Sequence, residues 1–140
     1  MTTPVEYEKR GKIGVITLNR PEARNAMNDA VRQGLVEAFA DASLNPDVWV
    51  VIVSGAGDKA FAAGADIAEF ANERADSRQA KIYGDLIHGT MQAVATCKHP
   101  TVAMIQGACV GGGLEIAACC DLRICGTSSR FGVPINKLGL

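Results

Sequence analysis

The segment GACVGGGLEIAACCDLRI, residues 107–124, carries the strongest structural signal in the chain, because three consecutive glycines lead directly into an apolar helix predicted over residues 113–120. Consecutive glycines cost conformational entropy, so a fold keeps them where side chains cannot fit. The first N–H groups of a helix have no partners within the helix and carry partial positive charge. We therefore expect this loop to present free amides to an anion.

Glu115 stands in the first turn of this predicted helix, in otherwise apolar company. A lone carboxylate at such a place is either a surface charge at the helix terminus or a general base in an apolar pocket. Burial and neighbouring helix amides act on a carboxyl group in opposite directions, so the residues alone favour neither interpretation.

A second loop of small residues, KAFAAGADI at 59–67, lies upstream. Its small side chains leave the backbone open to a ligand, and Gly64 permits a positive φ. Asp66 is a candidate cap for the following helix, which would turn the amides near Ala65 and Ile67 outward, toward developing negative charge. A plain surface turn explains the composition equally well.

The rest of the chain predicts alternating strands and helices. Residues 5–9 and 13–18 form a predicted hairpin, and residues 48–53, VWVVIV, form an apolar strand of the kind that is covered on both faces. Further strands are predicted at 101–105 and 121–125, and further helices after a cap at Asn28 or Asp29 and over 77–97. This order indicates one α/β domain with layered helices. We find no convincing sequence repeat.

Residues 55–60, GAGDKA, follow a predicted strand and fit the pattern G-x-G-x-x-A. A dinucleotide site requires a helix to begin within that pattern, whereas Gly64 interrupts the candidate helix. The dinucleotide interpretation is therefore weak.

The composition argues against several classes of partner. The 140 residues carry a formal net charge of -1, so they offer no basic field that would attract nucleic acid or an anionic membrane. No apolar run reaches the roughly 18 residues that span a bilayer, and residues 1–10 are too polar for the apolar core of a signal peptide. We expect a cytoplasmic protein.

The cysteines are odd in number, show no C-x-x-C spacing and have apolar neighbours, so we expect reduced, buried side chains. They are Cys97, Cys109, Cys119, Cys120 and Cys125. Neither histidine stands at metal-ligand spacing to a cysteine, so we expect no metal site.

Taken together, these segments resemble the crotonase (enoyl-CoA hydratase/isomerase) family. KAFAAGADI at 59–67 is similar to the family's first oxyanion and coenzyme A loop, and GACVGGGLEIAACCDLRI at 107–124 to its second. NRPEARNAMN at 19–28 is similar to a loop that helps to hold coenzyme A, and FGVPINKLGL at 131–140 to the segment with the other catalytic carboxylate. The resemblance implies, over residues 1–140, a spiral of β-β-α units with layered sheets and flanking helices that forms an acyl-CoA-binding core.

The same resemblance implies the site. The backbone N–H groups of Ala65 and Gly112 would form the oxyanion hole for a thioester carbonyl, and Glu115 would act as general acid/base. The residues implied to contact the acyl-CoA substrate are Ala23, Arg24, Ala26, Ala63, Ala65, Asp66, Ile67, Gly111 and Gly112. Coenzyme A is part of the substrate, so no separate cofactor is implied.

Two departures from the family pattern bear on the reaction. Where the hydratases carry a second glutamate, this chain has Ile135, followed by Asn136. Hydration uses two carboxylates on one water, whereas one carboxylate can move a proton between carbons, so isomerisation or related enolate chemistry stays open. The sequence also ends at Leu140, about half the family's usual extent, so we expect the trimerisation region to be absent.

The leading hypothesis is therefore an acyl-CoA lyase or isomerase that forms homo-oligomers, a trimer or a dimer of trimers at full length. Thioester hydrolysis and decarboxylation are alternatives within the family. A hypothesis from a different class is a module that binds acyl-CoA or partner subunits without turnover, which the missing second carboxylate supports. Phe70, Ile82 and Met91 are apolar, but their helical spacing indicates core rather than substrate contacts.

Overall fold

The first two strands and the helix after them set the pattern of the fold. In the computed structural model, which describes residues 3–69 and 76–134, β1 (Val5–Arg10) pairs antiparallel with β2 (Ile13–Leu18), as predicted. α1 (Asp29–Leu44) follows, and the Asn28 side chain caps it by accepting a hydrogen bond from the Val31 N–H at 2.9 Å. An N-cap of this kind satisfies one of the helix's unpaired amides.

The next two units repeat the order of two strands and a helix. β3 (Val50–Gly55) and β4 (Ala60–Ala62) precede α3 (Ser77–Ala95). β5 (Thr101–Ile105) and β6 (Ala108–Val110) precede α4 (Gly112–Cys119), and β7 (Leu122–Cys125) and β8 (Arg130–Gly132) come last. Short 3-10 helices occupy Pro21–Ala23 and Ile67–Glu69. The predicted spiral of β-β-α units is confirmed.

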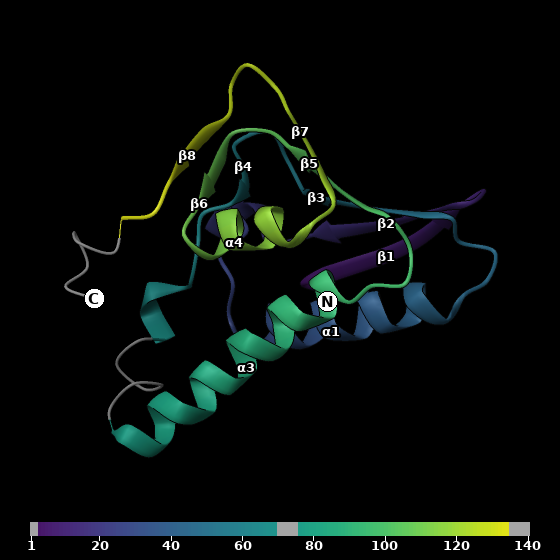
Figure 1. Cartoon of the computed structure of the whole chain (residues 1–140). Coiled ribbons are helices and arrows are strands. Elements are labelled where there is room, and N and C mark those ends of the chain that lie inside the picture. Colours follow the sequence, from purple (N-terminus) through teal and green to yellow (C-terminus); the bar gives the residue numbers. More distant parts are fainter. Residues whose placement is uncertain (1–2, 70–75, 135–140) are drawn as a thin grey trace.

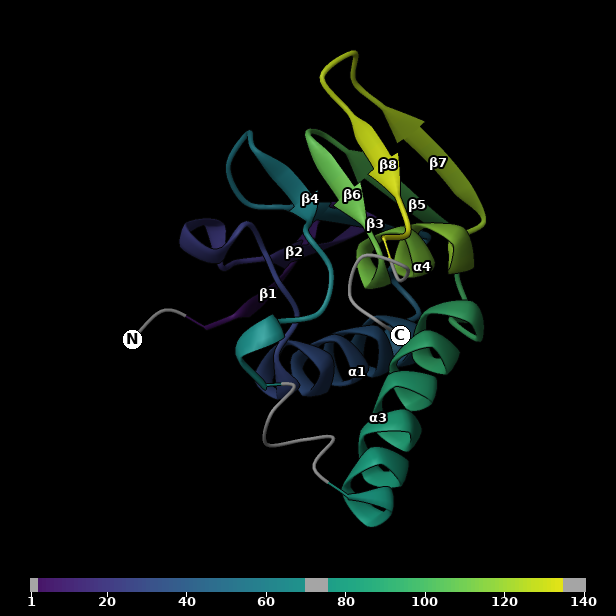
Figure 2. The same cartoon turned by 90° about the vertical axis from the view of Figure 1, so that its left-hand side faces the viewer.

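The strands form two sheets, because each later unit contributes one strand to each. The larger sheet has the order β1-β2-β3-β5-β7 and is parallel except for its first pair. The smaller sheet, β4-β6-β8, is parallel throughout. Figures 1 and 2 show α1 and α3 side by side below the strands, with α4 between these helices and the sheets. The predicted layering of helices on sheets is confirmed.

The core lies where alternate residues of the central strands meet the helices. Val51 and Val53 of β3 are fully buried, and they belong to one cluster with Ala103 of β5 and Phe39 of α1. Burial of apolar surface contributes about 25 cal/mol per Å², so this cluster is the main source of stability. It holds the carboxyl ends of β3 and β5 in place, and the chain segments after those ends carry the candidate site.

Three short strands were not predicted: β4 and β6 lie in segments predicted as loops, and β8 lies in a segment for which no element was predicted. β4, β6 and β8 have three residues each, too few for the alternation of apolar and polar side chains that marks a strand. They form because the parallel partners lie next to one another once the larger sheet has formed. The residues within and beside each of these strands do not indicate which strand it pairs with.

Two predictions about burial are wrong. The apolar run at 48–53 is covered well on one face only, since Trp49 is 60% exposed while Val50 and Ile52 are half-buried. In α3, Ile82 is 59% exposed, and the buried positions are Tyr83, Thr90 and Val94. Helical spacing predicted the helix and the burial of Val94, but not the burial of Tyr83 and Thr90.

Within residues 3–69 and 76–134, no helix combines the length and the apolar character that crossing a membrane requires. The cysteines are all unpaired. Cys109 and Cys120 are buried as predicted, whereas Cys125 on the edge strand β7 is exposed, so the prediction of burial is wrong there.

Candidate active site

The first glycine loop lies alongside the segment that leads into α1. Ala65 forms an isolated parallel bridge with Met27. The Met27 N–H donates to the Gly64 carbonyl at 2.8 Å, and the Asp66 N–H donates to the Met27 carbonyl at 3.0 Å. Both bonds use groups on either side of Ala65, so the N–H of Ala65 itself faces away from Met27.

The second glycine loop turns sharply into α4. Gly111 has φ 54° and ψ -122°, a conformation open to glycine and strained for other residues. Its N–H donates to the Gly132 carbonyl at 2.8 Å, and its carbonyl accepts the first bond of the helix, from the Glu115 N–H at 3.0 Å. Gly112 is the first helical residue, so its N–H has no partner within the helix.

Gly64 of the first glycine loop lies close to Gly111 of the second. A Cβ atom on Gly64, which has φ 103°, would stand 3.2 Å from the Val110 carbonyl oxygen and 4.0 Å from the Gly111 Cα. The residues that follow these glycines, Ala65 and Gly112, both line one cavity of about 300 Å³. Among the residues that the structure describes, neither of their N–H groups donates a hydrogen bond. Such a pair of amides is suited to bind an oxyanion.

Glu115 lines the same cavity from the first turn of α4. It is exposed, and within residues 3–69 and 76–134 its carboxylate has no hydrogen-bond or ion-pair partner. Burial, and after it the charge of Glu115, raises the pKa of the neighbouring Cys119 thiol. Glu115 is therefore exposed and at the same time lines the cavity, so the two interpretations from the sequence, a surface charge and a base in a pocket, do not exclude each other.

The segment at 19–28 is anchored to the first glycine loop. The Arg20 guanidinium donates to the Ala26 carbonyl at 2.6 Å and to Asp66 Oδ2 at 3.2 Å. The Ala63 N–H donates to the Arg24 carbonyl at 3.0 Å. The segments at 19–28, 59–67 and 107–124 are thus adjacent in space.

The structure separates the predicted contact residues into groups. Ala63, Ala65, Ile67, Gly111 and Gly112 line the main cavity. Arg24 instead lines a smaller cavity of about 200 Å³. Asp66 forms an ion pair with Arg20. Ala23 and Ala26 line neither of these two cavities. Met91 lines the main cavity and also packs on the core, which corrects our assignment of it to the core alone.

Three buried polar side chains at the cavity wall were not predicted from the sequence: Arg32, Tyr83 and Thr90. The Thr90 hydroxyl donates to the Leu86 carbonyl at 2.8 Å within α3. Arg32 lies next to Val31 and Leu35 on the apolar face of α1. A charged residue on such a face was the feature of the sequence that could have indicated a buried polar site.

Several predictions fall on residues outside the described ranges. They concern Phe70, Ile135, Asn136 and Leu140. Among the described residues, no group of three or more His, Cys, Asp and Glu side chains could hold a metal ion.

Comparisons with known proteins identify the family of the chain. A sequence model of the enoyl-CoA hydratase/isomerase family matches residues 8–140. The short-chain-enoyl-CoA hydratase of Clostridium acetobutylicum is 36% identical over 136 residues, which cover 97% of this chain and 51% of that protein. The crotonyl-CoA hydratase of Syntrophomonas wolfei is 37% identical over 133 residues, which cover 95% of this chain and 50% of that protein.

A crystal structure of an enoyl-CoA hydratase/carnithine racemase from Magnetospirillum magneticum matches the fold with a TM-score of 0.96. It is 46% identical, and the match covers 100% of this chain and 52% of that one. The chain therefore spans about half the length of the relatives that it matches.

Proposed function

This chain belongs to the enoyl-CoA hydratase/isomerase family, and from that premise we propose that it binds an acyl-CoA thioester and stabilises the enolate oxyanion formed from it. The Ala65 and Gly112 amides are the oxyanion hole, and Glu115 is the general acid/base. One observation supports the proposal: Ala65, Gly112 and Glu115, from two loops far apart in sequence, line a single cavity.

The reaction follows from the chemistry of a thioester. The Glu115 carboxylate takes a proton from the carbon next to the thioester carbonyl of a 3-enoyl substrate. The electron pair of the broken C–H bond moves toward the carbonyl oxygen, where the two amides stabilise the negative charge. Return of the proton from Glu115 to the γ-carbon moves the double bond into conjugation with the carbonyl.

The rate factors expected for the two amides and the carboxylate are together large enough for an enzyme. One well-placed oxyanion donor is worth on the order of 10²–10³ in rate. A positioned general base adds roughly 10²–10⁴. Ile135 stands where a second carboxylate would assist hydration, so we propose that isomerisation or another enolate reaction exceeds hydration.

The test is a product analysis on a panel of 2-enoyl and 3-enoyl thioesters, which starts with crotonyl-CoA and follows the enoyl absorbance. Glu115→Gln keeps the size of the side chain and should lower the rate by about 10²–10⁴ without loss of binding. Glu37→Gln removes an exposed carboxylate on α1 that does not line the cavity, so its rate should equal that of the wild type.

The second candidate is a module that binds acyl-CoA without turnover, and the absence of a carboxylate at Ile135 favours it. Tight binding of crotonyl-CoA with no product from any member of the panel, unchanged in Glu115→Gln, would replace the enzyme proposal with this one.

We also propose that the protein associates with copies of itself. Exposed apolar side chains on the outermost strands support this, since Leu122 and Ile124 of β7 and Phe131 of β8 are each at least 50% exposed. Such patches tend to be interfaces. Light scattering coupled to size exclusion measures the assembly, and a strictly monomeric chain contradicts it. The cytoplasmic location and the lack of a separate cofactor stay predictions from the sequence.

A further inference from the structure

Arg32 is a buried charge at the wall of the candidate active site, and the proposed reaction assigns it no role. Its side chain is 3% exposed and lines the main cavity. Burial of a guanidinium is costly unless hydrogen bonds and opposite charges compensate for lost hydration. The hydrogen-bond and ion-pair partners of Arg32 therefore indicate which part of the structure its burial stabilises.

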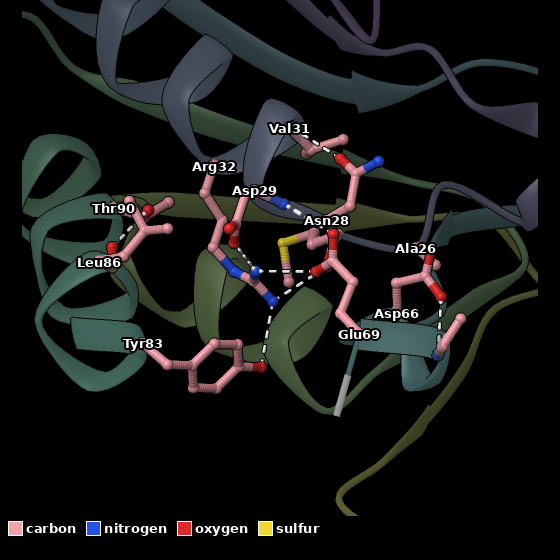
Figure 3. Close-up of polar contacts among 12 residues, drawn as sticks. Ala26, Asn28, Asp29, Val31, Arg32, Asp66, Glu69, Tyr83, Leu86 and Thr90 are labelled. Carbon is pink, nitrogen blue, oxygen red and sulfur yellow. Dashed lines mark hydrogen bonds and ion pairs between the residues drawn. The ribbon is translucent and has the colours of Figure 1, made fainter. Parts of the chain in front are cut away.

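The guanidinium joins three segments of the chain (Figure 3). Nη1 donates to Asp29 Oδ1 at 3.0 Å and lies 3.5 Å from Glu69 Oε2. Nη2 donates to the Met27 carbonyl at 2.9 Å and to the Tyr83 hydroxyl at 3.1 Å. The Tyr83 ring also lies under the guanidinium, with its centroid 4.8 Å from Cζ.

Two of these contacts hold the chain directly after Ala65 of the first glycine loop. The Met27 carbonyl that accepts from Arg32 also accepts the Asp66 N–H, directly after Ala65. Glu69 follows three residues later, and its other oxygen, Oε1, accepts from the Asp29 N–H at 3.3 Å. The loop from Gly64 to Glu69 is thus tied to the start of α1 at both ends.

Charge balance distinguishes a structural role from a direct electrostatic one. The carboxylates of Asp29 and Glu69 offset the positive charge of Arg32. The guanidinium is therefore a poor source of additional positive potential for an oxyanion. Its planar fork, which can donate in two fixed directions at once, is what these contacts use.

We infer that Arg32 is a positioning residue that holds the loop at 64–69 against Met27 and so aims the Ala65 N–H into the cavity. The inference rests on the proposed function, because the direction of this amide matters only when a thioester oxygen binds there. A small displacement of an oxyanion donor weakens its effect in the transition state more than it weakens ground-state binding.

The experiment compares the full chain with Arg32→Met, which keeps the length but removes every donor, and Arg32→Lys, which keeps the charge but not the fork. The readouts are kcat, KM and the infrared C=O stretch of bound crotonyl-CoA labelled with ¹³C at the carbonyl. In the wild type, the stretch falls relative to free crotonyl-CoA. In Arg32→Met most of that fall is lost, and kcat drops about 10-fold to 100-fold while KM changes less than about threefold. Arg32→Lys lies closer to Arg32→Met than to the wild type.

The matched control is Val48→Ala, which removes buried volume from the core at a residue that does not line the cavity. It should destabilise the chain but keep the carbonyl frequency and kcat. Equal losses in this control would overturn the inference, because general loosening would then explain the effect. If Arg32→Met does not fold, Glu69→Gln tests the contact between Arg32 and Glu69 instead. A carbonyl frequency that is unchanged in both Glu69→Gln and Arg32→Lys overturns the inference.

Failure of the proposed function has a different signature. If wild-type protein binds crotonyl-CoA and the C=O stretch does not fall, the Ala65 and Gly112 amides are not an oxyanion hole, and the role of Arg32 falls with them. If the stretch falls in the wild type and equally in Arg32→Met, only the inference about Arg32 fails.

Discussion

The side-chain amide of Asn25 donates a hydrogen bond to the carbonyl of Ala60 at 2.8 Å, which ties the segment at 19–28 to the strand that leads into the first glycine loop. The same amide donates to the Ala56 carbonyl at 3.0 Å, and its oxygen accepts from the Arg20 N–H at 2.9 Å. Asn25 is 1% exposed and has φ 56°, a left-handed conformation that asparagine tolerates better than most residues.

Asn25→Ala should therefore lower the free energy of unfolding by roughly 3 kcal/mol. Buried groups that lose their partners cost about 1–3 kcal/mol, and the left-handed backbone adds to this. Asn25→Gly loses the same bonds without the backbone strain, so it should be less harmful by about 1 kcal/mol. Urea unfolding measures both variants. Equal stability of Asn25→Ala and the wild type would show that these bonds contribute nothing.

Gly64→Ala should be more harmful than the same change at Gly11. Gly64 has φ 103° and faces the Val110 carbonyl, whereas Gly11 has φ 60° and open space where a Cβ would stand. A residue other than glycine in a sparsely populated backbone region costs about 1–3 kcal/mol, and the contact with Val110 adds to that. Turnover should fall in Gly64→Ala alone. Unfolding and initial rates test the pair, and similar losses in both variants would mean that the contact between the loops is unimportant.

Gly112→Ala should separate binding from stability. The added methyl group would collide with Met27 Cε, the end of a flexible side chain that can move aside. We expect a loss of less than about 1 kcal/mol in stability. Since Gly112 lines the cavity, crotonyl-CoA should bind about tenfold more weakly, a cost of roughly 1.4 kcal/mol. Gly132→Ala has open space around its Cβ and is the control. Isothermal titration calorimetry measures the affinity for crotonyl-CoA. An affinity of Gly112→Ala equal to that of the wild type contradicts the proposed site.

Buried thiols should make the fold sensitive to alkali. Burial raises the pKa of Cys109 and of Cys120 from 9.0 to about 11. Above pH 9 the unfolded chain then binds fewer protons than the native one, so stability falls as pH rises, by roughly 2 kcal/mol per thiol near pH 11. The double variant Cys109→Ala/Cys120→Ala should lose less stability over this range, and Cys125→Ala should behave like the wild type. Thermal unfolding at several pH values measures the slopes, and parallel slopes would contradict the prediction.

The sequence predicted most of the larger sheet and both long helices, because their apolar patterns extend over enough residues to show a period. The short strands β4, β6 and β8 escaped prediction, since three residues carry no period and their pairing depends on partners distant in sequence. The repeat of two strands and a helix was predicted only through the family resemblance, because no repeat is visible in the sequence itself.

The candidate site divides in the same way. The glycines at 64 and 111–113 and the carboxylate of Glu115 could be recognised in the sequence itself. Gly64 and Gly111 have a positive φ that few other residues adopt, and few residue types can act as a general base. That the two loops share one cavity, that Arg32 is buried beside it, and that Arg24 lies in another cavity depended on how distant segments pack. Local sequence determines which conformations each segment can adopt, whereas burial and long-range hydrogen bonds decide which segments meet.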